Sequence, residues 1–157
     1  MRIVVMSDSH FNFPVLKEIA NIQKSADIFV YLGDGELDFQ ELMHHYPEKE
    51  MHCVRGNCDG GSLTPFAEMM TCCGKQIFLT HGHLFRVKFG VEELKEHAVG
   101  IGADILLYGH THTPYTGYDD GLYIMNPGSV SLPKSGRPTY GIIDITDAGI
   151  VLNIAML

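Results

Sequence analysis

Short apolar runs alternate with segments of helical periodicity over the first two-thirds of the chain. The apolar runs predict strands at residues 2–6, 28–32, 51–54 and 105–108, and a hairpin formed by residues 69–73 and 76–80. Apolar residues spaced by three or four predict helices at residues 14–24, 36–46 and 91–99, and Gly100 is expected to close the last of them. This alternation is typical of a mixed α/β fold.

The last third of the chain carries strand patterns separated by turns. Strands are predicted at residues 122–125, 140–145 and 150–155, with a turn at residues 147–149 before the last. We therefore expect one domain over residues 1–157, in which the strands form two packed sheets with helices outside.

The composition is that of a globular protein, and its charge excludes some classes of binding partner. The sequence has 157 residues, is 45% hydrophobic and carries a formal net charge of −8. An acidic chain lacks the basic face that a nucleic-acid polymer requires, so no polynucleotide partner is expected. A small phosphate ester is not excluded, because bound metal ions can reverse the charge locally. No apolar stretch approaches the ~20 residues of a membrane span, so we expect a cytoplasmic protein without a membrane partner.

The four cysteines show no C-x-x-C spacing, which indicates reduced thiols rather than a zinc or redox motif. Cys72 and Cys73 are adjacent in a predicted strand and are therefore expected to point to opposite faces of it.

Side chains that bind metals follow five of the predicted strands directly. They are Asp8 and His10, Asp34, Asn57, His81, and His110 and His112. Because open α/β sheets bind ligands beyond the carboxyl ends of their strands, we expect these side chains to meet. The set mixes carboxylate, amide and imidazole groups, which suits transition metals better than Ca²⁺. Seven ligands exceed what one ion takes, so we expect two divalent ions that share a carboxylate, with Mn²⁺ first and Zn²⁺, Fe, Ni²⁺ or Mg²⁺ as alternatives.

These motifs, taken in order, resemble those of a known family. Asp8-Ser9-His10, Gly33-Asp34, Gly56-Asn57, His81-Gly82-His83 and Gly109-His110-Thr111-His112 resemble the motif series of the calcineurin-like metallophosphoesterases. Three features are similar to its small single-domain bacterial and archaeal phosphodiesterases: the short chain, Gly56-Asn57-Cys58-Asp59, and Asn126-Pro127-Gly128-Ser129, which a structural turn also explains. The resemblance implies a four-layer α/β/β/α sandwich with a dinuclear site. One metal is then held by Asp8, His10, Asp34 and His112, and the second by Asn57, His81 and His110 with Asp34 as the bridge.

The activity implied by the resemblance is hydrolysis of a small phosphate ester, most simply a phosphodiester. Two divalent ions outweigh the charges of Asp8, Asp34 and a bridging hydroxide, so the site carries about +1 within an acidic chain. The bridging hydroxide would attack phosphorus in line, while the two metals polarise the phosphoryl oxygens. No covalent intermediate with the protein is required.

The stretch RGNCDG at residues 55–60 departs from the family pattern. In much of the superfamily a His follows the motif Asn and is credited with protonating the leaving group, and here that residue is Cys58. Cys58 and His83 are therefore the candidate proton donors, while His83 can instead support a ligand by a hydrogen bond. Arg55, together with Asn57 and His83, can contact the substrate phosphate, or Arg55 can form a salt bridge at the strand end. Asp59 is expected either to lie in a turn or to hold a metal ligand in place by a hydrogen bond.

Three other functions compete with the phosphodiesterase. A phosphomonoesterase would use the same site. A metal-binding scaffold for other proteins would resemble the retromer subunit of this fold, but that subunit has lost a motif histidine, whereas this chain retains all seven ligands. A nuclease would need a basic path that the chain lacks.

The substrate is expected to contact loops at residues 37–45, 60–67 and 113–120. These loops carry no pattern that identifies the substrate. The sequence does not indicate the oligomeric state.

Overall fold

The computed structural model describes all residues 1–157 and contains two five-stranded sheets. One sheet has the order β10-β9-β1-β2-β3, formed by Gly149–Met156, Thr139–Thr146, Arg2–Met6, Ile28–Tyr31 and Glu50–Cys53. The other has the order β4-β5-β6-β8-β7, formed by Ala67–Cys72, Lys75–Thr80, Ile105–Tyr108, Leu122–Asn126 and Tyr115–Asp119. Three α-helices and one short 3₁₀ helix complete the fold: α1 (Phe13–Ile22), α2 (Glu36–His45), α3 (Glu92–Gly100) and the 3₁₀ helix His83–Phe85.

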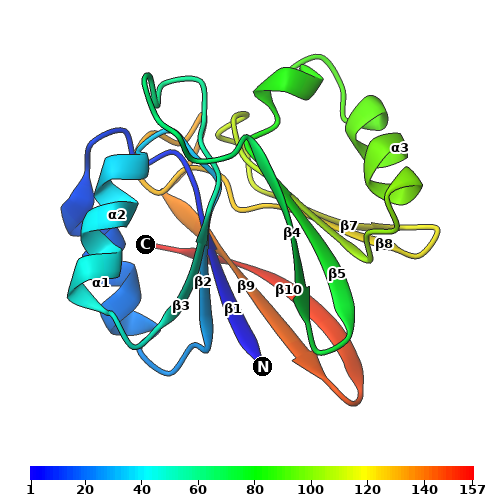
Figure 1. The fold of residues 1–157 in the computed structure, drawn as a ribbon, viewed down its shortest axis with the longest axis horizontal. Helices are drawn as coiled ribbons and strands as arrows, with labels where there is room; N and C mark the ends of the chain where they lie inside the picture. The colour runs from blue at the N-terminus through cyan, green and yellow to red at the C-terminus, as the bar shows by residue number, and fades with distance from the viewer.

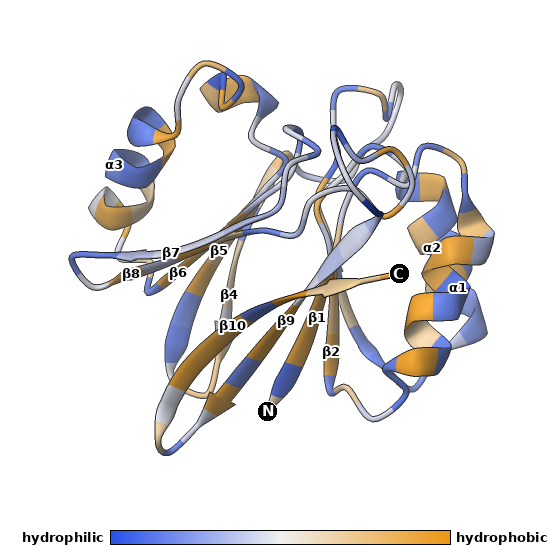
Figure 2. Cartoon of the chain, turned by 180° about the vertical axis from the view of Figure 1, so that it is seen from behind, coloured by the Kyte–Doolittle hydropathy of each residue, from blue (hydrophilic) through white to orange (hydrophobic).

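The two sheets pack face to face between helical layers. A core that includes Val5, Val30, Leu79 and Leu107 lies between the sheets. Helices α1 and α2 cover the outer face of the first sheet, and α3 covers the outer face of the second (Figure 1). The strands at the centre are largely hydrophobic, whereas the loops beyond one end of them are mostly polar or neutral (Figure 2). This is the four-layer α/β/β/α sandwich that the family resemblance implies.

Parallel pairing brings the functional loops to one end of the sandwich. In the first sheet β1 pairs in parallel with β2, and β2 with β3. In the second sheet β5 pairs in parallel with β6, and β6 with β8. The carboxyl ends of parallel strands lie at the same edge of a sheet, and the loops that follow them gather at the top of Figure 1, between the two helical layers.

The segments expected as substrate loops are partly regular structure. Residues 115–119 form strand β7, which pairs antiparallel with β8. The segment is mostly exposed and reads YTGYD, so no alternation of apolar and polar residues marks it as a strand. Residues 37–45 belong to helix α2 and not to a loop. Of the three segments, only residues 60–66, before β4, connect two elements without forming one.

The hairpin between β4 and β5 turns one residue earlier than predicted. Strand β4 ends at Cys72, and Cys73 and Gly74 form the turn with φ of 51° and 75°. Two positive φ values are the signature of the two-residue turn that suits twisted strands. Because Cys73 lies in the turn, its Sγ is 3.9 Å from that of Cys72. The expectation that these thiols point to opposite faces is therefore wrong.

Helix α3 ends on a different glycine from the one expected. Gly100 is still helical, and Gly102 adopts the left-handed conformation with φ of 78°. Beyond it, the N–H of Ala103 donates to the carbonyl of Ala98 at 2.9 Å, which closes the end of the helix.

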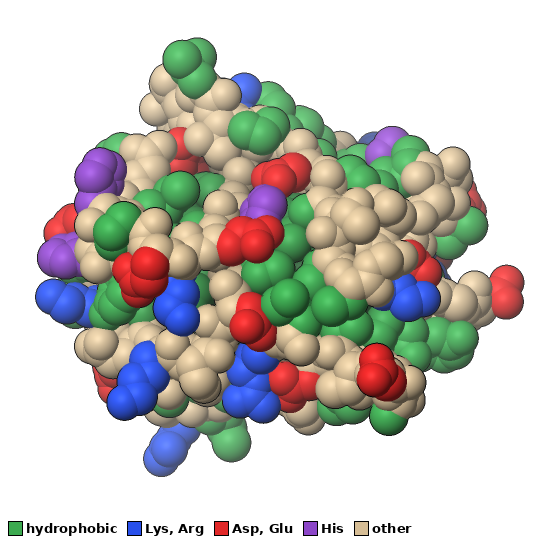
Figure 3. Space-filling view, turned by 60° about the horizontal axis from the view of Figure 1, so that its bottom comes forward, with side chains coloured by type: hydrophobic (Ala, Val, Ile, Leu, Met, Phe, Trp, Pro, Cys, Tyr) green, Lys and Arg blue, Asp and Glu red, His purple; other side chains and the backbone are tan.

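None of the helices is long and apolar enough to span a membrane. On the face shown in Figure 3, acidic and basic side chains are interspersed among hydrophobic ones.

His52 joins the edge strands of the two sheets. Its Nδ1 lies 2.6 Å from Oε1 of Glu68 on β4, and its Nε2 lies 3.0 Å from Oε1 of Glu50. Burial alone would lower the pKa of His52, but the hydrogen bonds and charges of the two carboxylates outweigh burial and raise it. The imidazole of His52 therefore connects β3 to β4.

We expect this contact to make stability depend on pH. Because folding raises the pKa of His52, its contribution is fully present below the ordinary value of 6.5 and is lost as the pH rises through the folded pKa. Glu68→Gln should lower the free energy of unfolding by about 1 kcal/mol at pH 5.5 and by less at pH 8.5. Urea unfolding at both pH values measures this, with the exposed Glu48→Gln as control. An equal loss at both pH values would contradict the pairing of charges.

Candidate metal centre

The seven predicted ligands lie in the loops that follow five strands. Asp8 and His10 follow β1, Asp34 follows β2, Asn57 follows β3, His81 follows β5, and His110 and His112 follow β6. The first three strands belong to one sheet and the last two to the other, so the site lies where the two sheets meet at their carboxyl ends. The structure brings the seven side chains together in one cluster with two parts.

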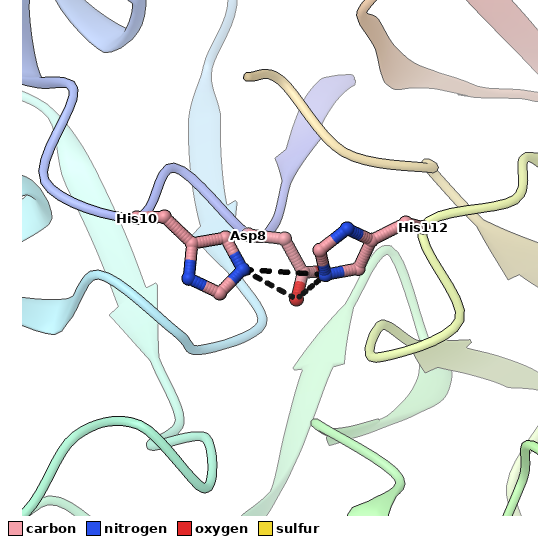
Figure 4. Close-up of side chains that lie close together, drawn as sticks. All are labelled: Asp8, His10 and His112. Carbon is pink, nitrogen blue, oxygen red and sulfur yellow. Dashed lines mark hydrogen bonds and ion pairs between the residues drawn. The ribbon is translucent and has the colours of Figure 1, made fainter. Parts of the chain in front are cut away.

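One part consists of Asp8, His10 and His112, whose candidate ligand atoms all lie within 4.8 Å of one another. The Nε2 atoms of His10 and His112 are 3.2 Å apart, and Oδ1 of Asp8 is 3.1 Å from Nε2 of His112. Figure 4 shows both rings turning a nitrogen toward the same carboxylate oxygen. Oδ2 of Asp8 is held by the Ser7 hydroxyl and the His110 N–H, at 2.5 and 3.2 Å. The carboxylate is thus fixed by one oxygen and presents the other.

The other part consists of Asp34, His81 and His110, again with candidate ligand atoms within 4.8 Å of one another. Nε2 of His81 lies 3.1 Å from Nδ1 of His110 and 3.4 Å from Oδ2 of Asp34. Oδ1 of Asn57 joins this part, at 3.2 Å from the same Nε2. A carboxylate, an amide oxygen and two imidazoles therefore face one point.

Asp34 lies between the two parts. A ligand atom of Asp34 is within 4.8 Å of those of His10 and Cys58, as well as of those of His81 and His110. Its Oδ1 accepts the N–H of Cys58 at 2.7 Å, which fixes the carboxylate. This placement is what a bridging carboxylate requires.

The donor atoms fit divalent cations. Oδ1 of Asp8 is fully buried and accepts no hydrogen bond, which would be costly unless a cation meets it. Nδ1 of His81 and Nδ1 of His112 each lie 2.6 Å from a backbone carbonyl, so each ring donates there and leaves Nε2 free as a ligand. Two nitrogens that bind one ion at about 2.1 Å are about 3.0–3.4 Å apart for angles of 90° to 109°. The observed spacings of 3.1 and 3.2 Å agree with this.

Backbone strain is concentrated in the same loops. Five of the seven residues have positive φ although none is glycine: Asp8, His10, Asp34, His110 and His112, with φ from 48° to 68°. Such conformations are uncommon for residues with a side chain and cluster at functional sites. Gly56 shows why the loops also need glycine, because a Cβ there would lie 2.1 Å from Oδ1 of Asp34.

Asp59 ties the stretch RGNCDG to the loop that carries Asp34. Its carboxylate accepts four backbone N–H groups, those of Asp34, Gly35, Glu36 and Gly56, at 2.7–3.0 Å. The expectation that Asp59 supports a ligand agrees with this geometry. The count of four donors was not predictable, because they come from two segments far apart in sequence.

The cluster couples the protonation of its members. Burial alone would raise the pKa of Asp34, but His81 and the Cys58 backbone hold it below its ordinary value. Burial would lower the pKa of His81, but the carboxylates of Asp34 and Asp8 raise it. Burial and the charge of His81 lower the pKa of His110 to about 4. Metal binding to such a cluster displaces protons from the imidazoles.

The candidate proton donors both border the cluster. Burial first, and then Asp34, raises the pKa of the Cys58 thiol to about 11. The ring of His83 lies 5.3 Å from that of His81 and 6.1 Å from that of His110. Nδ1 of His83 is buried without a hydrogen-bond partner, and burial lowers its pKa. His83 therefore offers a neutral imidazole with a free polar atom beside the cluster.

Arg55 forms no salt bridge, so that expectation is wrong. Its guanidinium donates to the carbonyl of Ser62 and stacks on the ring of Phe66, with Cζ 3.7 Å from the ring centroid. Both partners come from the segment after RGNCDG, so Arg55 secures this loop. A contact between Arg55 and the substrate phosphate would have to use the guanidinium N–H groups that do not donate to Ser62.

The turn at Asn126 supports the ligand loops. Nδ2 of Asn126 donates to the carbonyl of Gly109 and to the Thr111 hydroxyl, at 2.9 and 3.0 Å. The Ser129 hydroxyl donates to the carbonyl of Asp8 at 2.8 Å. This turn therefore connects the loops that carry Asp8, His110 and His112, as a structural reading of the motif expects.

Two lysines near the cluster were missed. Lys88 and Lys134 line a hollow of about 380 Å³ together with His110 and His112. Lys88 lies close enough for its charge to lower the pKa of His110. Neither lysine belongs to a motif, and only the fold brings them to this edge.

Comparison with known proteins identifies the family. Residues 1–148 match the model of the calcineurin-like phosphoesterase superfamily domain. The chain is 31% identical over 148 residues to the probable metallophosphoesterase YsnB of Bacillus subtilis (strain 168), covering 92% of this chain and 85% of that one. It is 30% identical over 189 residues to the phosphodiesterase YfcE of Escherichia coli (strain K12), covering 99% and 98%.

Solved structures agree at the level of the fold. A conserved, predicted phosphoesterase of Streptococcus pneumoniae TIGR4 superimposes with a TM-score of 0.87 at 29% identity, covering 99% of this chain and 88% of that one. Zinc-bound wild-type Vps29 from Entamoeba histolytica shares the fold with a TM-score of 0.77 at 21% identity, covering 99% of both chains. The motifs, the fold and the family match agree, and the chain belongs to the calcineurin-like phosphoesterase superfamily.

Proposed function

We propose that this protein is a dinuclear-metal phosphodiesterase that hydrolyses a small phosphate ester. The observation that carries the proposal is the convergence of seven O and N donors on two adjacent points, with Asp34 between them. Asp8, His10 and His112 would hold the first ion, Asn57, His81 and His110 would hold the second, and Asp34 would contribute to both. Mn²⁺ is the first candidate, because the donor set has no thiolate that would favour a softer metal.

The chain's own residues would prepare the ester for hydrolysis. When bound, two divalent cations supply an activated water for in-line attack on phosphorus and polarise the phosphoryl oxygens. Fixing one oxygen of Asp8 and one of Asp34 pre-orients the oxygens that face the cations. Asn57 and His83 would contact the phosphate, and Cys58 or, in its protonated form, His83 would protonate a poor leaving group.

We expect Lys88 and Lys134 to attract the phosphate into this site. Both are exposed, so each contributes on the order of 1 kcal/mol or less to binding. Lys88→Ala combined with Lys134→Ala should raise KM about tenfold and leave kcat nearly unchanged. Steady-state kinetics with bis(p-nitrophenyl) phosphate measure this, with the exposed Lys17→Ala as control. A fall in kcat without a change in KM would contradict the role.

The proposed function is tested by a substrate screen of the metal-loaded protein. Phosphomonoesters, phosphodiesters and cyclic nucleotides are offered in parallel, and we expect the highest kcat/KM for a phosphodiester. A preference for monoesters would make the protein a phosphomonoesterase that uses the same site. No hydrolysis of any class with both metals bound would favour a metal-binding scaffold, which the shared fold of Vps29 makes the second candidate.

A further inference from the structure

A groove opens beside the metal centre, and it shares no lining residue with the hollow that the two lysines line. It encloses about 350 Å³ and is lined by residues that follow three of the predicted ligands closely in sequence. Phe11 follows His10, Glu36, Leu37 and Gln40 come after Asp34, and residues 58–63 follow Asn57. Cys58 belongs to both the groove and the cluster, because its thiol lies within 4.8 Å of ligand atoms of His10 and Asp34. The groove is therefore continuous with the centre.

Part of the groove lining is apolar and exposed. Phe11, Leu37 and Leu63 line the groove and are 75%, 67% and 100% exposed. Single exposed apolar side chains are ordinary, but three around one hollow that opens on a candidate active site mark a ligand surface. Phe11 also has a φ of 66°, an outlier for an aromatic residue. The strained loop after His10 thus holds this ring at the groove.

Two carboxylates in the wall are already satisfied. Asp59 accepts its four backbone N–H groups, and Oε1 of Glu36 accepts Nε2 of Gln40 at 2.6 Å and the hydroxyl of Thr64. Both oxygens of Asp59 are therefore engaged, and the negative charge of the two carboxylates disfavours a second phosphate there. The groove therefore suits an uncharged group.

We propose that this groove receives the organic substituent of the phosphate ester, and that this substituent is uncharged, apolar and best aromatic. The inference rests on the proposed function, because the phosphate of the same molecule would lie at the metal centre. The volume is at the lower end of the ~300–1,000 Å³ of small-molecule sites, which fits one ring system rather than a polymer. Contacts from Leu37, Leu63 and the ring of Phe11 would favour an aromatic substituent over a methyl group.

Calorimetric titration of the Mn²⁺-loaded protein with phenylphosphonate and methylphosphonate tests this without hydrolysis. The two probes share a phosphonate and differ only in the organic group. We expect the wild type to bind phenylphosphonate at least tenfold more tightly than methylphosphonate. Leu37→Ser combined with Leu63→Ser should reduce that preference at least fivefold and leave methylphosphonate binding unchanged. Both leucines are exposed, so the variant should fold, and the exposed Val99→Ser on α3 is the matched control.

The outcomes separate the groove from the proposed function. Equal binding of both phosphonates by the wild type would refute the proposal that the groove receives the organic substituent. An unchanged preference in the double variant would refute it as well. Both outcomes leave the proposed function intact. Failure of both phosphonates to bind the fully loaded wild type would refute phosphate binding at the metal centre, and the groove with it.

Discussion

Asp34→Asn is expected to abolish phosphodiester hydrolysis, with a fall in kcat of at least about a thousandfold. The amide keeps the shape of the side chain but removes the negative charge that two cations would share. Oδ2 of Asp34 faces His81, and Oδ1 is held by the N–H of Cys58, so the carboxylate is fixed between the two parts of the cluster. We expect the variant to hold fewer metal ions per chain as well.

Metal content and steady-state rates of the same preparation measure both parts of this prediction. Asp147→Asn, in an exposed turn before β10, is the matched control and should retain full activity and metal content. Asp34→Asn with near-normal turnover would contradict a shared bridging carboxylate. Loss of activity with both metals still bound would show that Asp34 acts in some way other than by holding them.

Asp59→Ala is expected to have the second largest effect, although Asp59 is not a predicted ligand. Its carboxylate accepts four backbone N–H groups that connect RGNCDG with the loop after β2. Hydrogen bonds to a charged group are worth about 1.5–3 kcal/mol each and do not add fully, so we expect a loss of about 3 kcal/mol in unfolding free energy. Without this anchor, Asp34 and Asn57 would lose their fixed spacing, and kcat should fall at least about a hundredfold.

Urea unfolding and steady-state kinetics measure these two effects separately. Asp59→Asn is an informative companion, because an amide oxygen can accept some of the four donors without their charge assistance. It should fall between the wild type and Asp59→Ala in both stability and rate. Wild-type activity in a folded Asp59→Ala variant would show that the anchor is not needed to hold the ligand loops.

The ligand cluster was predictable because each member follows an apolar run that the fold buries. Ile3-Val4-Val5-Met6 before Asp8 is fully buried, and so is Ile105-Leu106-Leu107 before His110. Local pattern specifies such strands, and the carboxyl-end rule for α/β sheets then brings their loops together. Whether each side chain binds a metal remains a prediction that the experiments above address.

Features that depend on tertiary contacts were not predictable. Strand β7 has little apolar surface and exists because β8 offers it a pairing edge. Lys88 and Lys134 lie 46 positions apart in sequence and meet His110 and His112 only in the folded chain. A salt bridge to a carboxylate was one of the two roles expected of Arg55, but its guanidinium instead stacks on the Phe66 ring and donates to the Ser62 carbonyl. None of these pairings has a signature in local periodicity.

The number of metal ions required for hydrolysis tests the central claim most directly. Protein stripped by a chelator is titrated with Mn²⁺ at a protein concentration well above the dissociation constants, and hydrolysis of bis(p-nitrophenyl) phosphate is followed at each addition. The account predicts that activity rises to a plateau at two equivalents of Mn²⁺ per chain. A plateau at one equivalent, or no hydrolysis with two ions bound, would contradict it.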